Sequence, residues 1–260
     1  MMKIGGYEKN SLIDWDGKIA TVAFSSGCNF RCPFCHNPEL VIDPGDAFQS
    51  GLDMTDDFLA YLEQWKNWLE GVVVTGGEPT VHPDLPEFLY EIKRRGLPVK
   101  LDSNGSNPVL LEELIESGLV DYIAMDIKTA LEPDRYRQAC GRTVDLQPIR
   151  RSISMIMKGE CDYEFRSTVV PGLFDHDEIE LITEVISGAR RYVLQQFKPG
   201  VCLDPDYNQR KPYPDDYLRQ LRTRASGRVE SCLIRGEMVV GGEIPKNKSQ
   251  ITNDLFANVK

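Results

Sequence analysis

The sequence lacks any long hydrophobic run and has little basic charge. Its apolar runs, such as residues 21–24 and 72–74, are far shorter than the roughly 20 residues that a membrane-spanning helix needs. Thirty basic against 40 acidic side chains leave a net charge of −10, which disfavours nucleic acid and anionic membranes as partners. The first ten residues carry no apolar signal-peptide region, so we expect a cytoplasmic protein with no membrane association.

A disulfide framework is also not expected. The seven cysteines are an odd number in a chain without an export signal, so we interpret them as thiols and metal ligands. Three of them, Cys28, Cys32 and Cys35, lie within eight residues, and the other four are scattered. The 260 residues, 41% hydrophobic and 27% charged, are typical of a globular protein and exclude disordered, collagen-like and coiled-coil chains.

Short β-branched runs alternate with amphipathic stretches along the chain. We predict strands near residues 19–24, 72–75, 99–102, 122–126, 165–170 and 192–196, with a seventh near 229–234. We predict helices over residues 55–68, 85–95, 108–117, 146–157, 177–187 and 214–225. Thr55 is expected at the N-cap of the first helix and Trp65 on its buried face.

Repeated strand–helix–strand units build either a doubly wound α/β sheet or a partial or full β/α barrel. Both architectures place function at the carboxyl ends of the strands. The distinctive residues follow four of the predicted strands, namely Gly27-Cys28, Gly76-Gly77-Glu78-Pro79, Ser103-Asn104-Gly105 and Lys128. We therefore expect four loops to converge on one mouth.

The three clustered cysteines have the spacing C-x3-C-x2-C, and their Gly- and Pro-bearing loop can bring the sulfurs to one metal centre. Zinc with His36 as fourth ligand is disfavoured because His36 directly follows Cys35. Covalent c-type haem would require export, and a thioredoxin-like redox pair uses no third cysteine. A [4Fe–4S] cluster held by only three thiolates would leave one iron open to substrate, which is typical of a catalytic centre.

The cysteine triplet, with Phe34 before its last member and Gly-Gly-Glu-Pro after the second strand, resembles the radical S-adenosylmethionine (SAM) superfamily. Residues 4–6, 11–14, 27–40, 101–105, 124–128 and 163–166 resemble the activating proteins of anaerobic ribonucleoside-triphosphate reductases. The resemblance runs from residue 4 to about 198 and returns weakly at 234–236. It implies a partial (β/α)6 TIM-type barrel over residues 1–198, with a C-terminal extension, residues 199–260, that completes or caps the barrel.

The resemblance also implies two cofactors. A [4Fe–4S] cluster bound by the three cysteines would chelate SAM at its open iron and, once reduced, cleave it to a 5′-deoxyadenosyl radical and methionine. Gly76 and Gly77 would let the backbone approach the methionine group, and Glu78 would face its ammonium. The remaining predicted contacts to the cofactor are Phe34 against the adenine, His36 near the cluster or adenine, Pro79, and Ser103 and Asn104 toward the ribose.

Four charged residues complete the expected site. Asp102 and Asp126 match positions that hold a monovalent cation near the methionine carboxylate in related activases. Lys128 and Arg166 would neutralise that carboxylate, although an exposed surface charge remains the alternative for each. His82, by contrast, lies in a loop-like context and is expected in solvent, as is His176.

The implied function is that of an oxidoreductase, an oxygen-sensitive activase that removes a hydrogen from a backbone glycine of an anaerobic ribonucleotide reductase-like partner. Only 40 residues separate Cys35 from Gly76 and none is a cysteine, so flavodoxin or ferredoxin would have to supply the electron. Two alternatives stay open: a radical SAM enzyme acting on a small molecule, peptide or tRNA base, and a non-enzymatic iron–sulfur electron carrier. The carrier would need a fourth ligand from Cys140, Cys161, Cys202 or Cys232.

Overall fold

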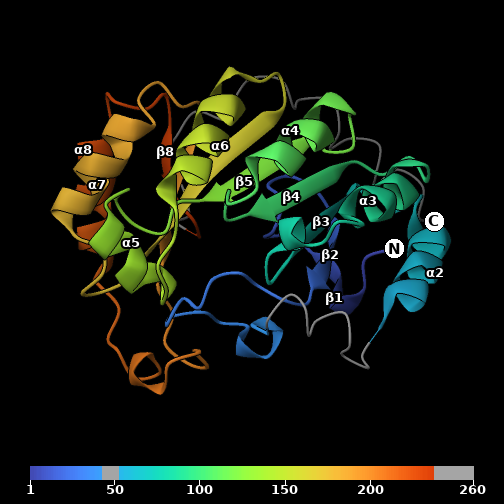
Figure 1. The fold of residues 1–260 in the computed structure, drawn as a ribbon, viewed down its shortest axis with the longest axis horizontal. Helices are drawn as coiled ribbons and strands as arrows, with labels where there is room; N and C mark the ends of the chain where they lie inside the picture. Colours follow the sequence, from blue (N-terminus) through green and yellow to red (C-terminus); the bar gives the residue numbers. More distant parts are fainter. Residues whose placement is uncertain (43–52, 237–260) are drawn as a thin grey trace, which may run out of the picture.

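The computed structural model describes residues 1–42 and 53–236 of the chain. These residues form one eight-stranded sheet in which the strands follow one another in chain order (Figure 1). The strands are β1 (Ile4–Ser11), β2 (Ala20–Ser25), β3 (Gly71–Gly76), β4 (Val99–Ser103), β5 (Tyr122–Asp126), β6 (Asp162–Val169), β7 (Tyr192–Gln196) and β8 (Cys232–Ile234). β1 pairs with β2 antiparallel, whereas every later neighbouring pair is parallel.

Helices connect the parallel strands and cover the outer face of the sheet (Figure 1). The α-helices are α2 (Thr55–Trp65), α3 (Leu85–Lys93), α4 (Pro108–Glu116), α5 (Pro133–Cys140), α6 (Leu146–Lys158), α7 (His176–Val185) and α8 (Asp215–Ala225). Three short 3-10 helices are η1 (Pro38–Leu40), η2 (Pro79–Val81) and η3 (Pro205–Tyr207). This arrangement confirms the expected α/β fold, a partial TIM-type barrel. Among the described residues, no helix is long and apolar enough to cross a membrane.

Alternate residues of each strand face the helices and the barrel interior. On β3, Val72 and Val74 belong to the large core between sheet and helices, and Val73 belongs to a smaller cluster on the other face. That smaller cluster contains Trp15 and Val22, and it fills the barrel interior toward the amino ends of the strands. The interior is therefore closed at one end, and the carboxyl ends of the strands remain for ligands.

Besides the three short 3-10 helices, two elements were not expected from the sequence. β1 is an antiparallel edge strand whose first residue, Ile4, lies opposite Ser25, so its amino end reaches the same rim as the carboxyl end of β2. α5 was missed because most of its side chains are polar and only three of its residues, Tyr136, Ala139 and Cys140, are buried. The segment after residue 198 contributes β8 to the same sheet, and its residues from 237 on lie outside the described part.

Two details of α2 differ from the prediction. Thr55 is the first helical residue instead of the N-cap, because its hydroxyl donates to the carbonyl of Met2 and accepts from the backbone of Ile4. The Asp53 carboxylate accepts from the Thr55 backbone N–H at 3.0 Å. Trp65 ends the helix and is 40% exposed, so its placement in the core was wrong.

The residue after α5 brings that helix into direct contact with the loop that follows β2. This cysteine loop, residues 26–37, carries all three clustered cysteines. Gly141 has a positive φ of 65°, and a Cβ built on it would lie 2.0 Å from the carbonyl oxygen of Arg31. Gly118, which follows α4, has nearly the same φ of 67° but nothing within 4 Å of a built Cβ.

Gly141→Ala is therefore expected to destabilise the protein more than Gly118→Ala. Both variants place a side chain in the left-handed region, at a cost of about 1–2 kcal/mol. Only Gly141→Ala also forces a clash with the cysteine loop, which adds about 1–3 kcal/mol. Urea unfolding followed by circular dichroism measures both losses, and equal losses would contradict the close contact at Gly141.

Candidate active site

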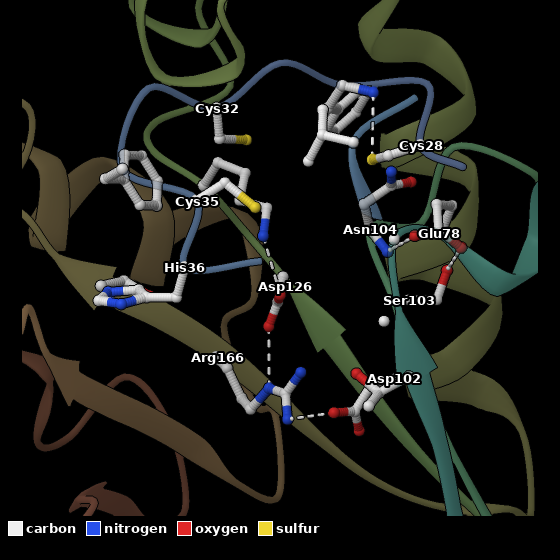
Figure 2. A pocket seen from close by; sticks show the side chains of 18 residues that line it. Cys28, Cys32, Cys35, His36, Glu78, Asp102, Ser103, Asn104, Asp126 and Arg166 are labelled. Atoms are coloured by element: carbon white, nitrogen blue, oxygen red, sulfur yellow. Dashed lines mark hydrogen bonds and ion pairs between the residues drawn. The ribbon is translucent and has the colours of Figure 1, made fainter. Parts of the chain in front are cut away.

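One pocket lies at the carboxyl ends of the strands, beneath the cysteine loop (Figure 2). Of the residues predicted for the site, only Pro79 does not line it; Pro79 instead begins η2 and is buried. Four further residues line the pocket: Phe30, Val41, Thr75 and Thr168. Thr75 precedes Gly76, and Thr168 lies two residues beyond Arg166 on the same strand face, so the sequence contained signals for both.

The cysteine loop is held at both ends by backbone hydrogen bonds. Gly27 and Cys28 donate to the carbonyls of Leu40 and Ile42 at 2.9 and 3.1 Å. The sulfur of Cys28 accepts from the backbone N–H of Phe30 at 3.3 Å. Burial raises the pKa of Cys28 to about 12 and also raises that of Cys35. The loop thus presents sulfur ligands that are costly to charge unless a positive group binds them.

Three thiols line this pocket, yet within the described ranges no three His, Cys, Asp or Glu side chains are arranged around a single metal ion. A mononuclear zinc site needs its ligands within bonding distance of one point. A four-iron cluster offers a different iron to each sulfur. The three thiols that line the pocket could therefore each bind a separate iron of such a cluster.

A fourth cysteine, Cys140 at the end of α5, lies against Cys32. The neighbouring Cys140 thiol holds the pKa of Cys32 below its usual value, while burial, together with the Cys32 thiol, raises the pKa of Cys140. Cys140 is fully buried and is not among the residues that line the pocket. The sequence offered Cys140 only as one of four possible further ligands and did not single out this contact, because the two residues belong to separate elements.

Gly76 and Gly77 allow the loop that follows β3 to pack on the end of β2 and the start of the cysteine loop. A Cβ on Gly76 would lie 2.4 Å from the nitrogen of Ser25, and one on Gly77 would lie 2.1 Å from the oxygen of Gly27. The backbone N–H groups of Gly77 and Glu78 donate to Ser25 and Gly27 at 2.9 and 2.8 Å. Both glycines are thus required by loop-to-loop contact, in addition to any approach of a ligand.

The Glu78 carboxylate links two loops. Its Oε1 accepts from the Thr80 hydroxyl at 2.5 Å and from the Ser103 hydroxyl at 2.8 Å, and its Oε2 accepts from the Asn104 backbone at 2.6 Å. Burial raises the pKa of Glu78, and these hydrogen bonds oppose the rise. Glu78 therefore orders the ends of β3 and β4, and its pairing with an ammonium group stays a prediction.

Asn104 ties the end of β4 to the cysteine loop. Its side-chain amide donates to the Asn29 carbonyl oxygen at 2.8 Å, and the Asn29 amide donates to the Ser106 hydroxyl at 2.7 Å. Asn29 was missed from the sequence. The two side-chain amides therefore hold the cysteine loop against the segment after β4. Ribose binding by Asn104 stays a prediction.

Four charged side chains of alternating sign cross the floor of the pocket (Figure 2). Lys128 Nζ lies 2.8 Å from one oxygen of Asp126, and Arg166 Nε lies 2.8 Å from the other. Arg166 Nη1 continues to Asp102 at 3.0 Å. Although burial opposes it, the charges of Arg166 and Lys128 hold the pKa of Asp126 well below its usual range. Lys128 and Arg166 are therefore pocket residues and not surface charges.

Two ring side chains lie beside the last cysteine. Phe34 is buried in the core and lines the pocket. His36 also lines the pocket, with its ring centroid 6.1 Å from that of Phe197, and burial together with Lys198 lowers its pKa. His36 is thus expected to be neutral at pH 7.

The prediction that the other two histidines lie in solvent was wrong for His82, whereas His176 is partly exposed. His82 is 2% exposed, and its Nε2 lies 2.7 Å from the Ser26 carbonyl oxygen, so it supports the start of the cysteine loop. His176 begins α7, and its ring packs on Tyr217 with centroids 4.8 Å apart.

Comparison with protein families gives a match to the radical SAM superfamily over residues 22–185. A protein of Methanocaldococcus jannaschii named as a glycyl-radical enzyme activating enzyme is 30% identical over 239 residues, which cover 89% of this chain and 95% of that protein. A pyruvate formate-lyase-activating enzyme of Listeria monocytogenes is 32% identical over 140 residues. That match covers 52% of this chain and 56% of the enzyme.

Among solved structures, SuiB of Streptococcus suis, in a complex with its precursor peptide SuiA, is similar in fold, with a TM-score of 0.62. The identity is 14%, and the match covers 83% of this chain and 48% of SuiB. The family match spans more than half of this chain, and the fold carries the motif cysteines at the mouth of a partial barrel. The chain therefore belongs to the radical SAM superfamily, and within it the chain resembles the glycyl-radical enzyme activating enzymes.

Proposed function

We propose that this protein is an activase that installs a glycyl radical on an anaerobic ribonucleotide reductase-like partner. The observation that carries the proposal is the pocket itself, where three cysteines of one loop face a floor of alternating charges. The Methanocaldococcus relative, matched over nearly its whole length, supports the activase class. The motifs at residues 4–6 and 163–166 support the reductase-like partner.

The residues present fit a [4Fe–4S] cluster. The sulfurs of Cys28, Cys32 and Cys35 would each bind one iron, and the positive charge of Lys128 in the same pocket would favour their thiolate form. Phe30 and Phe34 are buried beside the cysteines and would shield the cluster from water. Three protein ligands would leave one iron facing the pocket.

The charged floor fits the methionine end of SAM. When bound, the cluster and SAM together supply a 5′-deoxyadenosyl radical, the hydrogen-abstracting agent of this superfamily. Lys128 has three N–H donors and Arg166 has five, and their hydrogen bonds to the aspartates use one and two of these. The remaining donors would bind the methionine carboxylate and fix the orientation of the sulfonium.

Asp102 and Asp126 remain our proposed ligands for a monovalent cation. The Oδ1 atom of Asp102 is buried and makes no hydrogen bond within the described residues, which supports an additional positive partner at this position. Both oxygens of Asp126, by contrast, are already paired with Lys128 and Arg166. A cation here would therefore bind chiefly through Asp102.

An external protein is proposed as the electron donor, of the flavodoxin or ferredoxin class. Outside the cysteine loop and its neighbour Cys140, the described cysteines are Cys161, Cys202 and Cys232, and they do not cluster. A second cluster of this chain's own therefore has no ligand set in the parts that the structure covers. The open mouth of the pocket would admit a glycine-bearing loop of the partner.

Replacing Cys32 with Ala is expected to remove both the cluster and SAM cleavage. Anaerobically reconstituted wild-type protein should hold about four irons per chain and convert SAM to 5′-deoxyadenosine with dithionite. Iron analysis and chromatography of the products measure both. Cys161→Ala is the matched control, because Cys161 lies at the opposite ends of the strands, bonded to the Val120 carbonyl. Full turnover in Cys32→Ala would refute the proposed chemistry.

Lys128→Met is expected to raise the KM for SAM by about 10–100-fold, because a charge-assisted hydrogen bond contributes about 1.5–3 kcal/mol. Lys198→Met, which removes a positive charge near His36, serves as the control. The rate of 5′-deoxyadenosine formation at varied SAM concentration gives the KM of each variant. An unchanged KM in Lys128→Met would show that Lys128 does not contact SAM. The same assay in potassium and in tetramethylammonium salts tests whether a monovalent cation takes part.

Incubation of the reduced protein, SAM and a co-expressed anaerobic reductase should produce a glycyl-radical doublet by electron paramagnetic resonance. The doublet should disappear when the acceptor glycine of the reductase is replaced by Ala. SAM cleavage without a doublet, for every co-expressed reductase, would instead favour a radical SAM enzyme that acts on a small molecule, peptide or tRNA base.

A further inference from the structure

Cys140 is buried against the cysteine loop and outside the pocket, and the proposed radical chemistry gives it no role. Its thiol lies beside that of Cys32, and its backbone carbonyl accepts from the Arg31 N–H at 2.8 Å. The next residue, Gly141, approaches the Arg31 carbonyl so closely that a Cβ would lie 2.0 Å from it. Two backbone contacts from the end of α5 thus converge on Arg31, and they place Cys140 beside Cys32.

The pocket distinguishes two roles for this thiol. Cys28, Cys32 and Cys35 all line the pocket, whereas Cys140 is fully buried and is not among its lining residues. A fourth cluster ligand would have to line the pocket together with the other three cysteines. Cys140 is therefore placed to contact the ligand sulfur and not the open iron.

We propose that Cys140 is a positioning residue that donates an S–H hydrogen bond to the Cys32 sulfur of the bound cluster and raises the reduction potential of that cluster. This inference rests on the proposed cluster at the three cysteines. The ligand form of a cysteine is the thiolate, which accepts hydrogen bonds, so the neutral neighbour must be the donor. Reduction adds an electron to the cluster, and a donor at a ligand sulfur stabilises the more negative state.

Cys140→Ala should keep about four irons per chain and shift the midpoint potential of the cluster to a more negative value. Cys140→Ser keeps a donor at the same position and should lie closer to the wild type than Cys140→Ala. Cys161→Ala removes a thiol distant from the cluster and should leave the potential unchanged. The measurement is an anaerobic redox titration of each reconstituted holoenzyme without SAM, followed by electron paramagnetic resonance.

A second measurement detects the proton itself. Proton ENDOR spectra of the reduced wild-type cluster, reconstituted in H2O and in D2O, should reveal an exchangeable proton coupling that is absent from Cys140→Ala. An unchanged potential in Cys140→Ala, or an exchangeable coupling that survives in it, would overturn the proposal. A loss of iron in Cys140→Ala, with retention in Cys161→Ala, would also overturn it, because Cys140 would then act as a ligand or as part of the fold.

These outcomes are separable from failure of the proposed function. Wild-type protein that binds no cluster would contradict the cofactor assignment itself. Wild-type protein that holds the cluster and cleaves SAM, but shows the same potential as Cys140→Ala, would contradict only the role of Cys140.

Discussion

The site depends on close backbone contact between loops that follow different elements. The oxygen of Gly27 meets Gly77 on one side of the cysteine loop, and the oxygen of Arg31 meets Gly141 on the other, each where a Cβ would lie about 2 Å away. Hydrogen bonds from Glu78 to Gly27 and from Arg31 to Cys140 reinforce both contacts. The cysteine loop is therefore held between the end of β3 and the end of α5, and this packing determines where its sulfurs lie.

The parallel sheet supplies the second part of the site. Asp102 and Asp126 lie near the carboxyl ends of β4 and β5, and Arg166 of β6 lies opposite Asp126, so the three side chains meet in the same space. Glu78 stands apart from this line and serves the loops, with both oxygens bonded to Thr80, Ser103 or Asn104. The charged residues predicted for the site therefore have two roles: Glu78 orders the loops, and the other four form the floor of the pocket.

Much of this was predictable from the sequence. β5 and β7 have the predicted bounds, because their runs of apolar residues are short and end at polar residues. The site residues share one pocket because parallel strands end at one edge of a barrel. The contact between Cys32 and Cys140 and the buried position of His82 were not predictable, since both arise from packing between distant segments that no local pattern encodes. α5 was not predicted because it has too few apolar residues to show a helical pattern of hydrophobicity.

The floor of the pocket carries two positive and two negative groups, so its formal charge sums to zero. A phosphate or a simple dicarboxylate entering such a floor would meet repulsion from Asp102 and Asp126 that offsets its attraction to Lys128 and Arg166. A zwitterion bearing an ammonium and a carboxylate on adjacent atoms would instead find a partner for each end. In the function we propose, the alternation of sign would therefore favour the amino-acid end of SAM over a phosphate or a dicarboxylate.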